Sequence, residues 1–150
     1  MHESPNEKTK ELFIVPDVSR ERGEIERVAV EVFGAQDTGE FFSRFLEAAK
    51  TAPLVELSED IWSRLENTDS YDIPPKDWPL VKEHAVEGHP DHPRDWRFYK
   101  TRYEQGGPIE VPIIVKKGDA FHLVSGNTRL MVARAMGKVP KVLIVETDAS

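Results

Sequence analysis

The chain has 150 residues, of which 39% are hydrophobic and 31% are charged, and its formal net charge is -7 at pH 7. A globular chain of this length buries roughly two thirds of its unfolded surface, so we expect one soluble domain with one core. The negative charge disfavours a protein that coats nucleic acid by charge alone. The lack of cysteine excludes disulfides, thiolate zinc sites and thiol nucleophiles.

No apolar run approaches the roughly 20 residues that a membrane-spanning helix needs. The first residues, "MHESPNEKTKE", are polar where a signal peptide has an apolar segment. We therefore expect a cytoplasmic protein without a membrane partner.

The charge is divided unevenly along the chain. Up to Pro75 there are 17 acidic and 8 basic residues, whereas from Lys76 onward there are 10 acidic and 12 basic residues. A surface that attracts phosphate therefore belongs to the second half.

The first half is predicted to be mainly helical. Residues 1–10 are polar and predict a disordered lead-in, and residues 12–16 could form a short strand. Apolar residues then recur at helical spacing in three segments. These predicted helices run from Ser19 to the stop at Gly34, from an N-cap at Asp37 or Thr38, and from an N-cap at Ser58.

The second half changes from helical to strand periodicity. A proline-rich connection near residues 70–79 divides a single domain, residues 11–150, into an acidic part, 11–75, and a second part, 76–150. A short helix, a loop and an aromatic-basic helix come first. They are followed by strands at Val111–Val115 and Ala120–Val124, a helix at Asn127–Met136 and a last strand, "KVLIVE". This pattern predicts an α+β fold in which the helical N-terminal half packs on a small mixed sheet.

The stretch "FHLVSGNTRLMVARAMG" is the strongest candidate for a binding site. A strand that ends in Ser125-Gly126 and leads into a helix leaves the first N–H groups of that helix available to an anion, phosphate above all. Asn127 and Thr128 add short polar side chains, and Arg129 adds a fork suited to phosphate oxygens. The alternative is a capped helix with a solvated arginine.

The segment "GNTRLMVARAMG" resembles the pattern Gly-x-x-Arg-x-x-x-Ala-x-x-x-Gly of the ParB family and, more loosely, of sulfiredoxin. Gly126 and Arg129 match the glycine and arginine of that motif, and Ala133 and Gly137 match its two small residues. The resemblance covers residues 106–146. It implies a ParB/sulfiredoxin-like fold with a phosphate-binding strand, loop and helix.

The same resemblance implies a nucleoside triphosphate, ATP or CTP, with Mg²⁺, bound by Ser125, Gly126, Asn127, Thr128 and Arg129. The implied activity is a kinase-like phosphotransferase that acts on a small hydroxyl compound or on nucleic acid. Without cysteine, sulfiredoxin chemistry is excluded. Family members have more charged or more reactive pairs where this chain has Asn127-Thr128. No helix-turn-helix domain is expected, so a chromosome-partition clamp is disfavoured.

Two other functions stay open. One is a non-catalytic DNA- or protein-binding accessory module of a phage or mobile element, which would bind tightly without turnover and whose helical half could contact a protein partner. The other is a ParB-like nuclease, which ranks lowest because no cluster of Asp and Glu surrounds the motif.

Two side chains near the motif are candidates for proton transfer. Phosphoryl transfer needs a carboxylate or histidine to orient the attacking hydroxyl. Glu110 precedes the first strand of the motif region, and His122 lies on the second strand. His122 alternates with apolar residues, so a structural role is the competing interpretation.

Two segments between residues 84 and 103 have an ordinary and a functional interpretation. Three histidines, His84, His89 and His92, with Asp91 and Asp95 nearby, could bind a divalent metal. Polar loops collect such residues by chance, so we predict no metal site. The helix "RDWRFYKTRYEQGG" could stack bases and contact phosphates, but its spacing favours core packing with a basic rim.

Overall fold

The computed structural model describes residues 12–87, 91 and 94–147 of the chain, so the predicted lead-in at 1–10 lies outside the described residues. Within this part the protein is α+β, with six α-helices, a two-stranded sheet and a mixed five-stranded sheet. None of the helices in the described part has the length and apolar character needed to cross a membrane.

The five-stranded sheet has the order β2-β7-β5-β6-β3. Its central strand β5 pairs parallel with β7 and antiparallel with β6. The strands are β2 (Leu54–Glu56), β3 (Leu65–Glu66), β5 (Ile113–Lys117), β6 (Ala120–Ser125) and β7 (Lys141–Glu146). A separate parallel pair is formed by β1 (Phe13–Ile14) and β4 (Ile109–Glu110).

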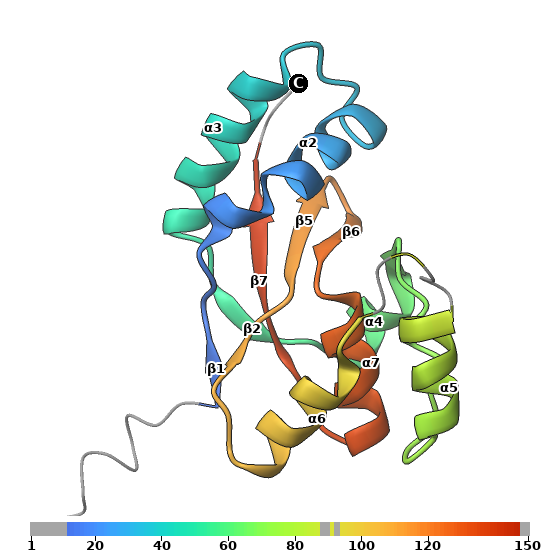
Figure 1. Ribbon diagram of the computed structural model, residues 1–150. Helices are drawn as coiled ribbons and strands as arrows, with labels where there is room; N and C mark the ends of the chain where they lie inside the picture. Colours follow the sequence, from blue (N-terminus) through green and yellow to red (C-terminus); the bar gives the residue numbers. More distant parts are fainter. Residues whose placement is uncertain (1–11, 88–90, 92–93, 148–150) are drawn as a thin grey trace, which may run out of the picture.

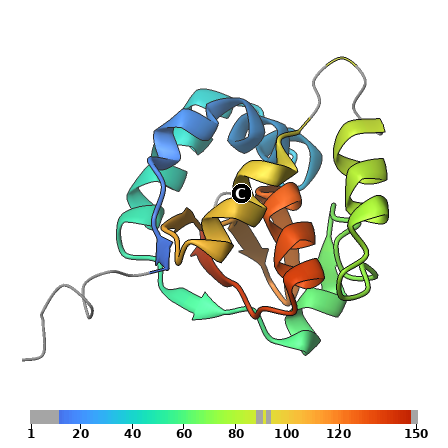
Figure 2. The same ribbon diagram turned by 60° about the horizontal axis from the view of Figure 1, so that its bottom comes forward.

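The helices cover both faces of the sheet, with α2 and α3 together on one side and α6 and α7 side by side on the other (Figures 1 and 2). They are α2 (Arg22–Glu31), α3 (Thr38–Lys50), α4 (Glu59–Arg64), α5 (Trp78–Lys82), α6 (Trp96–Glu104) and α7 (Asn127–Met136). A 3₁₀ turn, η1 (Val18–Glu21), precedes α2, and a π-helical turn, η2 (Glu83–Glu87), follows α5.

Alternation along β5 divides the core into two clusters. Ile113 and Val115 are buried beneath α2 and α3, and Ile114 is buried beneath α6 and α7. Successive side chains of a strand point to opposite faces, so a strand buried on both faces reads as a continuous apolar run. Packing against the two faces of the sheet therefore fixes the positions of α2 and α7 relative to each other.

Helix boundaries agree with the predicted caps. The side chain of Asp37 accepts a hydrogen bond from the N–H of Glu40 at the start of α3, and that of Ser58 accepts one from Ile61 in α4. The bounds of α7 are those predicted from the sequence. Each cap satisfies one of the N–H groups that a helix start leaves unpaired.

Three features differ from the prediction. The mainly helical first half also contributes β2 and β3, which pair with β7 and β6. The strand expected at Val111–Val115 begins two residues later, as β5 at Ile113, because Pro112 has no N–H for a ladder, and the two residues before Val111 form β4. The helix expected after Ser19 begins instead as a 3₁₀ turn capped by Asp17.

Tyr103 is expected to make the stability of the protein depend on pH in the alkaline range. Its side chain is buried, with an edge-to-face contact to Phe13, and burial raises the pKa of its phenol, an effect that Arg129 only partly offsets. A pKa that is higher in the folded state contributes stability that is complete below the unfolded value, near 10, and is lost as pH rises. We expect the free energy of unfolding to fall above this pH by up to about 1.4 kcal/mol per pH unit.

Urea unfolding between about pH 8 and about pH 11 measures this loss. Tyr103→Phe should flatten the alkaline part of the curve, whereas Tyr71→Phe, at an exposed position, serves as the matched control. Equal alkaline slopes for Tyr103→Phe and the parent protein would contradict the prediction.

Candidate functional site

The start of α7 has the backbone geometry of an anion site. Gly126 is the N-cap residue and is left-handed, with φ 111° and ψ 20°, and Asn127 after it is helical. A left-handed residue followed by a right-handed one turns successive N–H groups toward the same point. No side chain of the described residues caps this helix, so the first-turn N–H groups face outward with the positive end of the helix dipole.

Only glycine fits at position 126. A Cβ built there would lie 2.6 Å from Cβ and 2.8 Å from Cα of Pro112. The approach is this close because Ser125 pairs with Ile113, which places the chain leaving β6 across Pro112. The residues of this bend and of the first turn of α7 line a cavity.

This cavity has a volume of about 420 Å³ and lies where α2, α6 and the start of α7 meet. Its size is within the range of small-ligand sites, roughly 300–1,000 Å³. All five residues predicted to bind phosphate line it, namely Ser125, Gly126, Asn127, Thr128 and Arg129. The rest of the lining is Glu21, Glu24, Arg27, Asn67, Arg94, Asp95, Tyr99, Leu123 and Val124.

The cavity lining is formally balanced in charge. Its arginines are Arg27, Arg94 and Arg129, and its carboxylates are Glu21, Glu24 and Asp95. Attraction of an anion therefore depends on which charges are already paired and on the backbone donors of α7. The sequence did not identify the residues contributed by α2, because they are distant in sequence from the motif.

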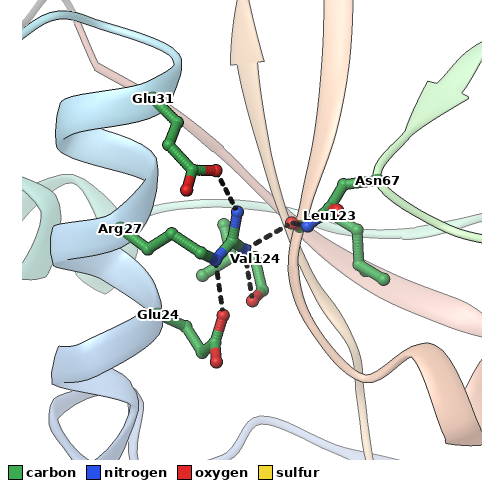
Figure 3. A network of polar contacts seen from close by, with 6 residues as sticks. All are labelled: Glu24, Arg27, Glu31, Asn67, Leu123 and Val124. Carbon is green, nitrogen blue, oxygen red and sulfur yellow. Dashed lines mark hydrogen bonds and ion pairs between the residues drawn. The ribbon is translucent and has the colours of Figure 1, made fainter. Parts of the chain in front are cut away.

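Arg27 is paired inside the protein (Figure 3). Its Nε donates to Glu24 at 2.8 Å and its Nη1 to Glu31 at 3.2 Å, while its Nη2 lies 3.4 Å from the carbonyl oxygens of Leu123 and Val124. The side chain is 27% exposed, so these contacts are partly shielded from solvent. Arg27 thus fixes α2 to the end of β6 and forms a wall of the cavity.

Only part of the Arg129 guanidinium group is used in contacts with the protein. Its Nη1 donates to the carbonyl oxygens of Glu110, at 2.8 Å, and Val111, at 3.2 Å. Its guanidinium carbon lies 5.7 Å from the centre of the Tyr99 ring, within cation–π range. Within the described residues its Nε and Nη2 have no acceptor, so these two nitrogen atoms remain available to donate hydrogen bonds to a ligand oxygen.

The side chain of Asn127 contacts the loop after β3. Its Oδ1 accepts a hydrogen bond from Thr68 at 2.5 Å, and its Nδ2 donates to Asp69 at 2.8 Å. The other oxygen of Asp69 lies 2.8 Å from Nδ1 of His84. The amide of Asn127 therefore positions the first turn of α7, and Asn127 is also one of the residues that line the cavity.

A buried hydroxyl continues this polar chain into the core. Thr68 donates to Asn127, so it accepts from Ser70 at 2.7 Å, and Ser70 in turn accepts from Nε1 of Trp62 at 2.9 Å. Ser70 is fully buried. The side-chain hydroxyl of Ser70 and the indole N–H of Trp62 therefore both have partners, and these bonds hold the loop against α7.

Ser70→Ala is expected to destabilise the protein by about 1–3 kcal/mol, because the indole N–H of Trp62 loses its acceptor while it stays buried. In a Trp62→Phe background the same change should cost less than about 1 kcal/mol. Urea unfolding of the four proteins of this cycle measures the difference. Ser63→Ala, at an exposed position of α4, is the control, and additive effects at Trp62 and Ser70 would contradict the proposed bond.

The two predicted proton-transfer residues are not among the residues that line the cavity. The Glu110 carboxylate lies 3.7 Å from Arg20 at the surface, and only its backbone carbonyl contacts Arg129. His122 is half-buried on β6, on the opposite face from Phe121 and Leu123. Their catalytic role stays a prediction.

The histidine segment shows no metal centre in the part of the chain that is described. His84 contacts Asp69, and the side chain of Asp95 caps α6 by accepting from the N–H of Phe98. His89 and His92 lie outside the described residues. No group of three His, Asp or Glu side chains in the described part is arranged to hold a metal ion.

The start of α7 is therefore the place where a cavity, outward N–H groups and an incompletely paired arginine coincide. Comparison of the chain with models of known protein families, with curated proteins and with solved structures finds no match.

Proposed function

We propose that the protein binds a nucleoside triphosphate, ATP or CTP, whose phosphates contact the start of α7. The observation that carries the proposal is the left-handed Gly126 before an uncapped helix that opens into the cavity beside Arg129. Such a helix start offers several N–H donors and a positive dipole end to one phosphate group. The proposal includes a domain of ParB/sulfiredoxin type, supported by the motif from Gly126 to Gly137.

Several atoms of the lining suit a phosphate chain. The hydroxyl of Ser125 is buried and has no hydrogen-bond partner in the described part of the chain, so it can donate to a ligand oxygen. Thr128 adds a second hydroxyl, and the fork of Arg129 suits phosphate oxygens. The exposed guanidinium of Arg94 adds a positive charge to the lining.

Mg²⁺ fits the same lining as a partner of the phosphates. Magnesium at nucleotide sites is bound by one or two carboxylates together with phosphate oxygens and water, so a cluster of three protein ligands is not required. Glu24 is paired with Arg27, and Asp95 caps α6. We therefore assign the protein ligand to Glu21, a half-buried residue that lines the cavity.

The proposed reaction is phosphoryl transfer to a hydroxyl group of a small compound or of nucleic acid. Catalysis of this reaction consists mainly of positioning and charge stabilisation, which the N–H groups of α7 and Arg129 would supply. Neither Glu110 nor His122 lines the cavity, so we assign the proton acceptor to neither of them.

A thermal-shift panel of ATP, ADP, CTP and GTP, each with and without Mg²⁺, tests the proposal. A ligand present at about 100 times its dissociation constant adds about 2.7 kcal/mol to the free energy of unfolding. We expect a triphosphate with Mg²⁺ to raise the melting temperature more than the diphosphate does. No shift with any nucleotide at millimolar concentration would contradict nucleotide binding.

A further inference from the structure

An exposed aromatic ring of α6 has exposed arginines near it in sequence. Phe98 is 52% exposed, Arg97 beside it is exposed, and Arg94, two residues before the helix begins, is exposed as well. Arg102, one turn after Phe98, is half-buried. These four residues form a surface that we call the α6 basic face. Figure 2 shows α6 on the outside of the molecule, beside α7.

The α6 basic face is positive although the whole chain has a net charge of -7. Three described carboxylates lie close in sequence, namely Asp91, Asp95 and Glu104, and the last two have a partner. Asp95 accepts from the backbone of Phe98, and Glu104 pairs with Lys100 at 2.6 Å. Among the described residues no carboxylate forms an ion pair with Arg94, Arg97 or Arg102. This face therefore has positive charge available for an anionic partner.

Other aromatic residues of α6 anchor the helix, and Phe98 does not. Tyr103 is buried, and Trp96 stacks on Trp78 with 5.5 Å between ring centres. Phe98 touches the edge of the Tyr99 ring at 5.2 Å and lies 5.5 Å from the guanidinium of Arg102. Its ring thus stands among cations at the surface and adds little to the core.

We propose that the α6 basic face binds single-stranded nucleic acid, with phosphates on the arginines and an unpaired base stacked on Phe98. Arginines supply the charge that follows a phosphate backbone, and an exposed ring supplies a stacking surface that accepts any base. A paired base cannot reach the ring, so a duplex gains only the charge contacts.

The face continues toward the cavity at the start of α7. Arg94 belongs to both, and Tyr99, in contact with Phe98, also lines the cavity. A single-stranded nucleic acid bound along α6 would therefore place one of its nucleotides near the proposed phosphate site. The proposal for the α6 basic face rests on the residues of that face alone and does not depend on nucleotide binding in the cavity.

Fluorescence anisotropy with a labelled oligothymidine of about 20 nucleotides tests the proposal. We expect Phe98→Ala to weaken binding by at least about fivefold through the lost stack. Arg97→Ala should lower the slope of log K against log salt by about one, because one phosphate contact is lost. Arg44→Ala removes the same charge from α3, where Arg44 pairs with Glu40, and should change binding by less than about twofold.

Further measurements distinguish single-stranded nucleic acid from duplex and from an acidic polypeptide. The single strand should bind more tightly than a duplex of equal length, and polyglutamate should compete weakly. The proposal would be overturned if the single-stranded and duplex oligonucleotides bound with equal affinity, or if polyglutamate competed strongly. It would also be overturned if Phe98→Ala bound as tightly as the parent protein, or if no binding occurred at about 50 mM salt. Circular dichroism confirms that Phe98→Ala is folded. Strand binding without any nucleotide shift would leave this surface intact and contradict only the cavity proposal.

Discussion

Gly126→Ala is expected to lower the free energy of unfolding by about 2–5 kcal/mol. Two costs add at this position. An L-residue at φ 111° is strained, and the new Cβ would lie 2.6 Å from Cβ of Pro112. Neither atom can move alone, because Pro112 belongs to the backbone between β4 and β5 and its carbonyl accepts from Leu143.

Gly118→Ala is the matched control for Gly126→Ala. Gly118 also has a left-handed φ, 59°, but a Cβ there would meet nothing within 4 Å. It should therefore cost only the conformational part, about 1–2 kcal/mol. Urea unfolding measures both variants. Equal losses at the two glycines would show that the contact with Pro112 does not constrain the start of α7.

Arg129→Ala is expected to weaken binding of the nucleotide selected by the thermal-shift panel by at least about tenfold, which corresponds to one charge-assisted hydrogen bond. The physical reason is the loss of the Nε and Nη2 donors, which have no acceptor among the described residues, from a side chain that lines the cavity. Arg129→Lys should recover only part of the affinity, because an ammonium group cannot make the paired contacts of a guanidinium. Calorimetric titration measures all three proteins.

Stability and binding must be separated for Arg129, since its Nη1 also holds the carbonyl groups of Glu110 and Val111. Unfolding curves without nucleotide give the first effect, and titration at a temperature where each variant is folded gives the second. Arg44→Ala is again the control for removal of one surface charge. Unchanged affinity in folded Arg129→Ala would remove this residue from the site.

Local signals in the sequence predicted the elements that depend on neighbouring residues. The caps Asp37 and Ser58 and the whole of α7 follow from residue preferences within one or two turns. These predictions were confirmed because no distant contact competes with the local preference.

Elements that depend on distant contacts were missed. β2 and β3 have three and two residues, too few to show a strand period, and they form because β7 and β6 offer open edges. Arg27 reaches the cavity only because α2 packs beside β6. The contacts of the Asn127 side chain with Thr68 and Asp69 were not predicted, because these partners lie nearly 60 residues earlier.

The most direct test of the phosphate site is an amide-resolved NMR titration of nitrogen-labelled protein with ATP and with CTP in the presence of Mg²⁺. Binding at the start of α7 predicts that the largest shifts fall on the backbone amides of Ser125 to Arg129, with smaller ones at Tyr99. Shifts concentrated elsewhere, such as around Lys116 in the separate cavity between α3 and α4, or no shifts at saturating nucleotide, would contradict it.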